Sequence, residues 1–136
     1  MRRVAFALLL LASVAHAQDT RTFREFGGHD GVERITVDLV DRLVKDPRIK
    51  HIFDHADLER FTHQLTKQLC ELTGGPFRYQ GRSMKEVHSG MGLRTADFNA
   101  LVEDLQDAME KFRVPNRAQN KLLSKLAPMF HGIVER

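Results

Sequence analysis

Apolar residues recur every three or four positions along most long segments of the chain, and no segment shows the sustained alternation typical of a strand. Because this spacing puts apolar side chains on one face of a helix, the pattern predicts an all-α fold. The first of these apolar faces, here called a stripe, ends where Asp46-Pro47 disfavours helical geometry. A short helical turn is expected after it, over residues 48–53. The stripe consists of Val32, Ile35, Leu39, Val40, Leu43 and Val44.

Three more long helices are predicted by stripes of the same kind. Asp57 can cap the first of them, which the Gly74-Gly75-Pro76 step ends. The next starts at Thr95, and the last starts at Asn116 and should bend at Pro128. The stripes consist of Leu58, Phe61, Leu65, Leu69 and Leu72; of Phe98, Leu101, Val102, Leu105, Met109 and Phe112; and of Leu122, Leu123, Leu126, Met129, Phe130 and Ile133.

Between these helices lies a glycine-rich segment, residues 74–92, with only a short helical stretch over 83–89. So short a helix is weakly held by its own hydrogen bonds, and a bound ligand would order it. His88 lies at the end of this stretch, where its imidazole can bind a metal from one side. A single histidine beside a glycine is more often only a polar residue at a helix end. The motifs around His88 are therefore needed to tell a metal ligand from an ordinary helix end.

The first residues have the layout of a secretory signal peptide: basic Met1-Arg2-Arg3, an apolar run over residues 4–14, and Ala15-His16-Ala17 as a cleavage site. We expect residues 1–17 to be removed, residues 18–136 to form one domain, and the mature protein to be exported to the periplasm. The apolar run is too short for a permanent transmembrane helix and no second one occurs, so stable membrane insertion is not expected.

Charge and cysteine content restrict the partners further. The formal net charge of +3 includes Arg2 and Arg3, so the mature chain is close to neutral, with charges of alternating sign along its helices. Nucleic acid is therefore not an expected partner. Cys70 is the only cysteine, so the chain cannot form an internal disulfide, and we expect this thiol to be a small core residue.

Several short motifs occur in a fixed order after a minimal first helix. They are Phe26-Gly27-Gly28, the run from Asp46 to Phe53, Thr73-Gly74-Gly75-Pro76, Tyr79-Gln80-Gly81, Met84 four residues before His88, and Val114-Pro115. In this order and spacing the chain resembles the first group of the truncated haemoglobins, from about Phe23 to Ile133. The resemblance implies a two-over-two helical globin fold around haem b. The cofactor is expected to be non-covalent, because the chain has no Cys-x-x-Cys-His attachment motif.

The same resemblance assigns roles to individual residues. His88 corresponds to the proximal histidine that binds the haem iron, and Arg60 and Arg82 are candidates for pairing with the propionates. The residues expected to contact haem are Phe53, Phe61, Leu65, Met84, Val87, Phe98, Val102 and Phe130. Their aromatic and aliphatic side chains suit a flat apolar macrocycle.

The distal side departs from the family pattern. Many members carry a tyrosine in the second helix and a glutamine over the distal face, and these hydrogen-bond the bound oxygen. Here Val40 occupies the tyrosine position, and Phe61 and Leu65 occupy the haem-facing positions of the distal helix. The distal side is therefore expected to be largely apolar, although Gln64 at the edge of the stripe can still turn inward.

Two other groups of histidines could also bind a metal. Some relatives use a distal-helix histidine as a second iron ligand, but His63 lies about 200° around the helix from Phe61 and should face away from haem. His51 and His55 could form half of a zinc or copper site on one helical face. No motif supplies the remaining ligands, so we expect a solvated corner there.

These observations predict a haem b protein that reversibly binds the diatomic gases oxygen, nitric oxide or carbon monoxide, as an oxygen carrier, store or sensor. The main alternative is an enzyme that uses the same haem as a nitric oxide dioxygenase or a weak peroxidase. Either activity requires an external electron donor that this chain does not encode. A haem-free helical interaction module is a third class, which a visible absorption spectrum would separate from the other two.

Overall fold

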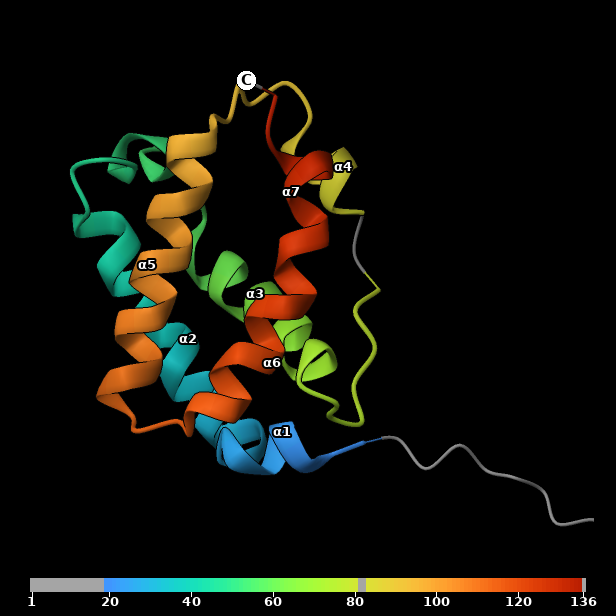
Figure 1. The fold of residues 1–136 in the computed structure, drawn as a ribbon. Helices are drawn as coiled ribbons and strands as arrows, with labels where there is room; N and C mark the ends of the chain where they lie inside the picture. Colours follow the sequence, from blue (N-terminus) through green and yellow to red (C-terminus); the bar gives the residue numbers. More distant parts are fainter. Residues whose placement is uncertain (1–18, 81–82, 136) are drawn as a thin grey trace, which may run out of the picture.

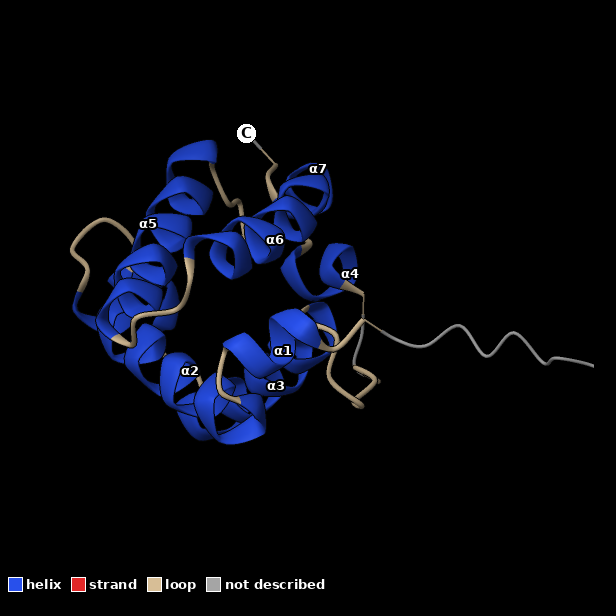
Figure 2. Cartoon of the chain, turned by 60° about the horizontal axis from the view of Figure 1, so that its bottom comes forward, coloured by secondary structure: helices blue, strands red, loops and turns tan. Residues whose placement is uncertain are grey.

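The computed structural model describes residues 19–80 and 83–135, and these residues contain helices and loops but no strand (Figure 2). The predicted all-α class is confirmed. No helix in these two ranges is long and apolar enough to cross a membrane. The elements are α1 (Arg21–Glu25), α2 (Gly28–Lys45), the 3-10 helix η1 (Lys50–Phe53), α3 (Leu58–Leu72), α4 (Met84–His88), α5 (Thr95–Lys111), α6 (Asn116–Leu126), the 3-10 helix η2 (Ala127–Met129) and α7 (Phe130–Ile133).

The long helices form two layers of two (Figure 1). One layer holds α2 and α3, which contact each other extensively, and the other holds α5 and the column made by α6, η2 and α7. α2 also packs against α5, while α1 contacts both α2 and α6 and so closes one end of the molecule. α4 stands apart from the two layers and lies beside α7.

Local sequence explains where these helices start and stop. α2 ends at Asp46, whose extended backbone is the conformation favoured before a proline. Asp57 caps α3, as expected, because its side chain accepts a hydrogen bond from the Arg60 amide at 3.1 Å. Pro128 lacks a backbone N–H, and the helix gives way there to the 3-10 turn η2 before it resumes as α7, so the regular helix is interrupted at the position where a bend was predicted.

One glycine allows the first two helices to meet closely. A Cβ atom on Gly31 would lie 1.9 Å from the carbonyl oxygen of Phe26, so any side chain at this position would force α1 and α2 apart. Phe26 is only 4% exposed and joins the main core, which explains why the close approach is maintained. Phe26, the first residue of the Phe26-Gly27-Gly28 motif, therefore has a structural role at this junction.

The main core lies where α2, α3, α5 and α6 meet. Cys70 is fully buried in it, as predicted, and burial raises the pKa of its thiol to about 11. The thiol is therefore protonated and enclosed in the folded protein. The largest buried core side chains include Ile35, Leu39, Leu43, Ile49, Leu105, Met109 and Leu122.

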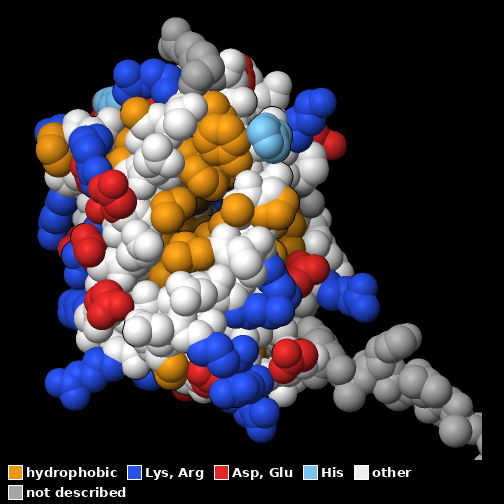
Figure 3. Space-filling model, viewed as in Figure 1, with side chains coloured by type: hydrophobic (Ala, Val, Ile, Leu, Met, Phe, Trp, Pro, Cys, Tyr) orange, Lys and Arg blue, Asp and Glu red, His pale blue; other side chains and the backbone are white. Residues whose placement is uncertain are grey.

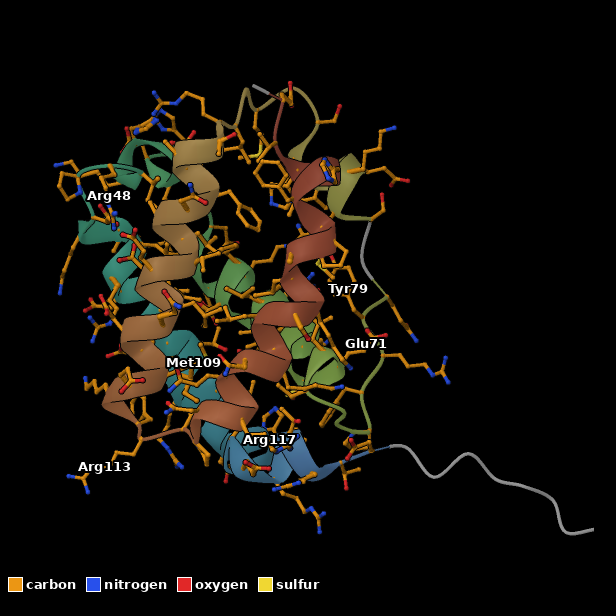
Figure 4. All side chains as sticks on the ribbon, viewed as in Figure 1. Arg48, Glu71, Tyr79, Met109, Arg113 and Arg117 are labelled. Atoms are coloured by element: carbon orange, nitrogen blue, oxygen red, sulfur yellow. The ribbon has the colours of Figure 1, made fainter. Side chains whose placement is uncertain are left out.

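Met109 offers a test of this core (Figure 4). Its side chain is fully buried, so Met109→Ala should leave a cavity and lower the free energy of unfolding by about 2–5 kcal/mol. Chemical denaturation measures the change. Val37→Ala is the control, because Val37 is 54% exposed and should change stability by about 0.5 kcal/mol or less. Equal stability of the two variants would contradict the assigned core.

Candidate functional site

An apolar cavity of about 290 Å³ lies among η1, α3, α4, α5 and the α6–α7 column. Figure 3 shows apolar side chains gathered around a hollow on this face, in a surface that otherwise carries many charges. Apolar residues normally collapse onto each other in a domain of this size. A lined hollow of this kind is therefore the default candidate for a ligand site.

His88 lies at the end of α4 and lines the cavity. Ser83 starts this helix, because its hydroxyl accepts a hydrogen bond from the Glu86 amide at 3.2 Å. The Nδ1 atom of His88 is 2.7 Å from the Met84 carbonyl oxygen. Since a carbonyl only accepts hydrogen bonds, Nδ1 must carry the proton, and Nε2 keeps the lone pair that a metal ion would use.

Most of the residues expected to contact the ligand come together here. Phe53 and Phe61 pack against each other in the wall, with ring centroids 5.4 Å apart and planes inclined by 45°. The expected residues that line the cavity together with His88 are Phe53, Phe61, Leu65, Met84, Val87 and Phe98.

Two of the residues expected to contact haem, Val102 and Phe130, are not among the residues that line the cavity. Leu101 lines the cavity in place of Val102, because Leu101 and Val102 fall about 100° apart on either side of Phe98 and only one side faces inward. Phe130 stands behind the wall and packs edge-to-face on Phe98, with centroids 5.3 Å apart. Phe130 therefore supports the wall from behind.

The sequence interpretation missed several lining residues. Leu126, Met129 and Ile133 belong to the stripe of the last helix, so periodicity could have identified them. Tyr79 comes from the loop before α4, where no periodic signal exists; Glu71 holds it by accepting a hydrogen bond from its backbone amide (Figure 4). The other lining residues that were not predicted are Ile49, Ile52, Ala56, Gln68, Met91, Leu93, Asp97 and Leu101, while Gln64, which the sequence left as able to turn inward, also lines the cavity.

The wall from α3 is less apolar than expected, because Gln64 and Gln68 both line the cavity. The Gln68 amide donates to the Met84 sulfur at 3.0 Å, which ties α3 to α4. No described residue forms a hydrogen bond with the Gln64 side chain, so its amide remains available to a ligand. Val40, in contrast, is buried and does not line the cavity.

The alternative histidine sites lie outside the cavity. His63 is exposed and absent from the lining, as the helical register predicts. His51 and His55 are exposed too, and no third metal-binding group accompanies them among the described residues. The one cluster of three possible ligands found there, His29, Asp30 and Glu33, lies fully on the surface.

A second hollow adjoins the cavity and shares Ile52, Met91, Leu93 and Asp97 with it. This mouth is polar, since His51 and Arg94 also line it. Arg94 binds Asp97 at 3.1 Å, and this contact holds the pKa of Asp97 below its usual range. Arg60, an expected propionate partner, is exposed and lines neither hollow, and Arg82 lies outside the described residues.

The fold and sequence are similar to known proteins. Residues 21–135 match the family described as "Bacterial-like globin". The group 1 truncated hemoglobin of Tetrahymena pyriformis is 30% identical over 99 residues, which cover 73% of this chain and 82% of that protein.

Solved structures agree with the sequence comparison. The truncated hemoglobin from Tetrahymena pyriformis in its Fe(III) form has a TM-score of 0.81 at 26% identity, over 85% of this chain and 98% of that one. The 2/2 hemoglobin from Synechococcus sp. PCC 7002, solved with covalently attached heme, has a similar fold, with a TM-score of 0.77 at 20% identity over the same shares of the two chains. Since the matches extend over nearly the whole described chain, this protein belongs to the bacterial-like globin family, within the group 1 truncated haemoglobins.

Proposed function

We propose that the chain holds haem b non-covalently through His88 and reversibly binds oxygen, nitric oxide and carbon monoxide, as an oxygen carrier, store or sensor. Membership of the globin family implies a haem cofactor and gas binding in general. The observation that carries the finer proposal is the 2.7 Å contact between His88 Nδ1 and the Met84 carbonyl. It fixes the imidazole and leaves Nε2 as a ligand for iron.

The cavity fits such a cofactor chemically. Three phenylalanines, Phe53, Phe61 and Phe98, offer flat apolar surface to a macrocycle, and the polar mouth offers His51 and Arg94 to its acidic groups. When bound, haem would supply an iron atom with one position open to a gas. Cys70, the only cysteine, is buried in the core and is not among the lining residues, which supports a non-covalent cofactor.

Gln64 is the residue best suited to discriminate between gases. Its amide can donate a hydrogen bond into the cavity, whereas the neighbouring Phe61 and Leu65 can only exclude water. Bound oxygen carries partial negative charge and gains from a donor, while carbon monoxide is much less polar. The expected apolar distal side is therefore replaced by an apolar pocket with one available amide.

Binding without turnover is favoured over the enzymatic alternative. Peroxidase chemistry needs a group that moves a proton near the reacting atoms. The lining residues of α3, the wall that holds the proposed gas-binding amide, are Phe61, Gln64, Leu65 and Gln68, none of which titrates. The titratable lining residues Tyr79, His88 and Asp97 come from other segments. A nitric oxide dioxygenase needs less from the pocket but depends on an external reductant, so it remains the alternative for this site.

Replacement of His88 tests the proposed iron ligand. His88→Ala should lower haem affinity by about tenfold or more, because the iron then lacks its protein ligand. Added imidazole should restore part of the binding. Haem titration followed by visible absorption measures both effects, and His63→Ala, which alters an exposed histidine of α3, is the control. A wild-type spectrum from His88→Ala would refute the assignment.

Replacement of Gln64 tests the distal donor. Gln64→Leu should speed oxygen dissociation by roughly twofold to tenfold, which is the loss of one hydrogen bond of about 0.5–1.5 kcal/mol. Carbon monoxide dissociation should change less. Stopped-flow kinetics provide the measurement, with Gln68→Leu as the matched control because that amide already bonds to Met84. Equal effects of the two substitutions on oxygen release would contradict a distal role for Gln64.

We also propose that the protein is exported after cleavage behind Ala17. This segment lies outside the described residues, so the proposal rests on the Ala15-His16-Ala17 site and the apolar run before it. Mass spectrometry of the protein from periplasmic and cytoplasmic fractions of a producing bacterial cell should find a mature form that begins at Gln18 in the periplasm. An intact Met1 terminus confined to the cytoplasm would contradict export.

A further inference from the structure

Two buried aspartates face each other where α2 ends against α5. Asp46 is the C-terminal cap of α2 and is 8% exposed, while Asp104 of α5 is 7% exposed. Arg48 lies beside both: its Nη2 is 2.8 Å from Asp46 Oδ2 and 3.8 Å from Asp104 Oδ1 (Figure 4). The same guanidinium also pairs with Glu103, so one cation serves three carboxyl groups.

The hydrogen bonds at this corner are distributed unequally. Asp46 accepts from the backbone amide, Nε and Nη2 of Arg48. Asp104 Oδ2 is buried and has no hydrogen-bond partner among the described residues. A buried carboxylate oxygen without a donor is strongly destabilising. Both carboxyls lie against the same Arg48 Nη2, which makes them close neighbours, but two ionised carboxylates can only accept hydrogen bonds.

We propose that Asp46 and Asp104 share one proton, carried by Asp104, and that its release at higher pH weakens the contact between the end of α2 and α5. With the proton in place, Asp104 becomes a donor to Asp46. The proton also removes the negative charge of Asp104, so that Arg48 pairs with two carboxylates instead of three.

The surrounding charges favour this arrangement. Burial first, and then the hydrogen bond with Asp46 and its charge, raise the pKa of Asp104 to about 7, while Arg48 opposes the shift. Asp107, one turn further along α5, adds to the rise. Arg42 of α2 also faces the pair but is bound to Asp38 at 2.6 Å. For Asp46 the direction is opposite, because hydrogen bonds from Arg48 hold its pKa well below the usual range.

The same corner positions part of the cavity wall. The Asp46 carbonyl accepts hydrogen bonds from the amides of Ile49 at 3.1 Å and Lys50 at 2.8 Å, which form the turn into η1. Ile49 is 2% exposed and lines the cavity. A change in the packing of Asp46 against Asp104 is therefore transmitted to a wall residue through one short turn.

The expected pH dependence follows from the raised pKa of Asp104. A carboxyl that holds its proton more tightly when folded stabilises the fold fully below its ordinary pKa of 3.8, and that contribution is lost as the pH rises through about 7. Unfolding should thus become easier between about pH 4 and 7, in contrast to the usual behaviour of an ion-paired carboxylate.

Carbon-13 NMR of the aspartate side chains in the purified wild-type protein tests the shared proton directly. One carboxyl should titrate near neutral pH, and the Ile49 methyl resonances should move with the same midpoint. If every aspartate titrates below about pH 5, the proposal is wrong. If the carboxyl titrates near neutrality while the Ile49 signals stay fixed, the transmission to the cavity wall is wrong.

A substitution provides the second test. Asp104→Asn replaces the shared proton with a permanent amide donor, so the fall in thermal midpoint between pH 5 and pH 8 should become smaller than in the wild type. Asp107→Asn is the comparison on the same helix: Asp107 is exposed and makes the smallest of the contributions to the raised pKa of Asp104, so this variant should reduce the fall much less. An undiminished fall in Asp104→Asn, or an equal reduction in both variants, would overturn the proposal.

Discussion

The burial of α2 between α3 and α5 is the contact on which the remaining elements depend. It fixes the distance between the two layers, and the large apolar residues of α2, such as Ile35, Leu39 and Leu43, are almost completely buried in it. The cavity lies toward one side of this contact and can stay open because the core beside it is filled. A globin of this size therefore separates the part of its interior that carries stability from the part that carries a ligand.

α4 illustrates the opposite situation, since a helix of five residues has too few internal hydrogen bonds to persist alone. It is held by contacts from outside: the Ser83 cap, the Gln68 amide on the Met84 sulfur, and packing against α7. Each of these contacts restricts the segment that presents His88. The chain thus positions its candidate metal ligand through neighbours, with little help from local helix propensity.

The helices and some of the aromatic and aliphatic cavity residues could be predicted from the sequence, for physical reasons. Periodicity shows which face of a helix is apolar, so α2, α3, α5 and α6 could be predicted together with the Asp57 cap. It does not show which neighbour covers that face, so it could not decide between Leu101 and Val102 on α5, or whether Gln64 of α3 would line the cavity. The pairing of Asp46 with Asp104 joins residues far apart in the chain, and no local pattern indicates it.

The reactivity of Cys70 can report on opening of the folded domain. Its thiol is fully buried, protonated and surrounded by the main core, so a thiol reagent in solution can reach it only when α2 and α3 separate. Modification at this single position should therefore follow opening of the whole domain, because small local fluctuations do not expose it. In an oxidising environment the same shielding keeps folded molecules from cross-linking, while unfolded molecules expose one reactive sulfur each and become the species that pair.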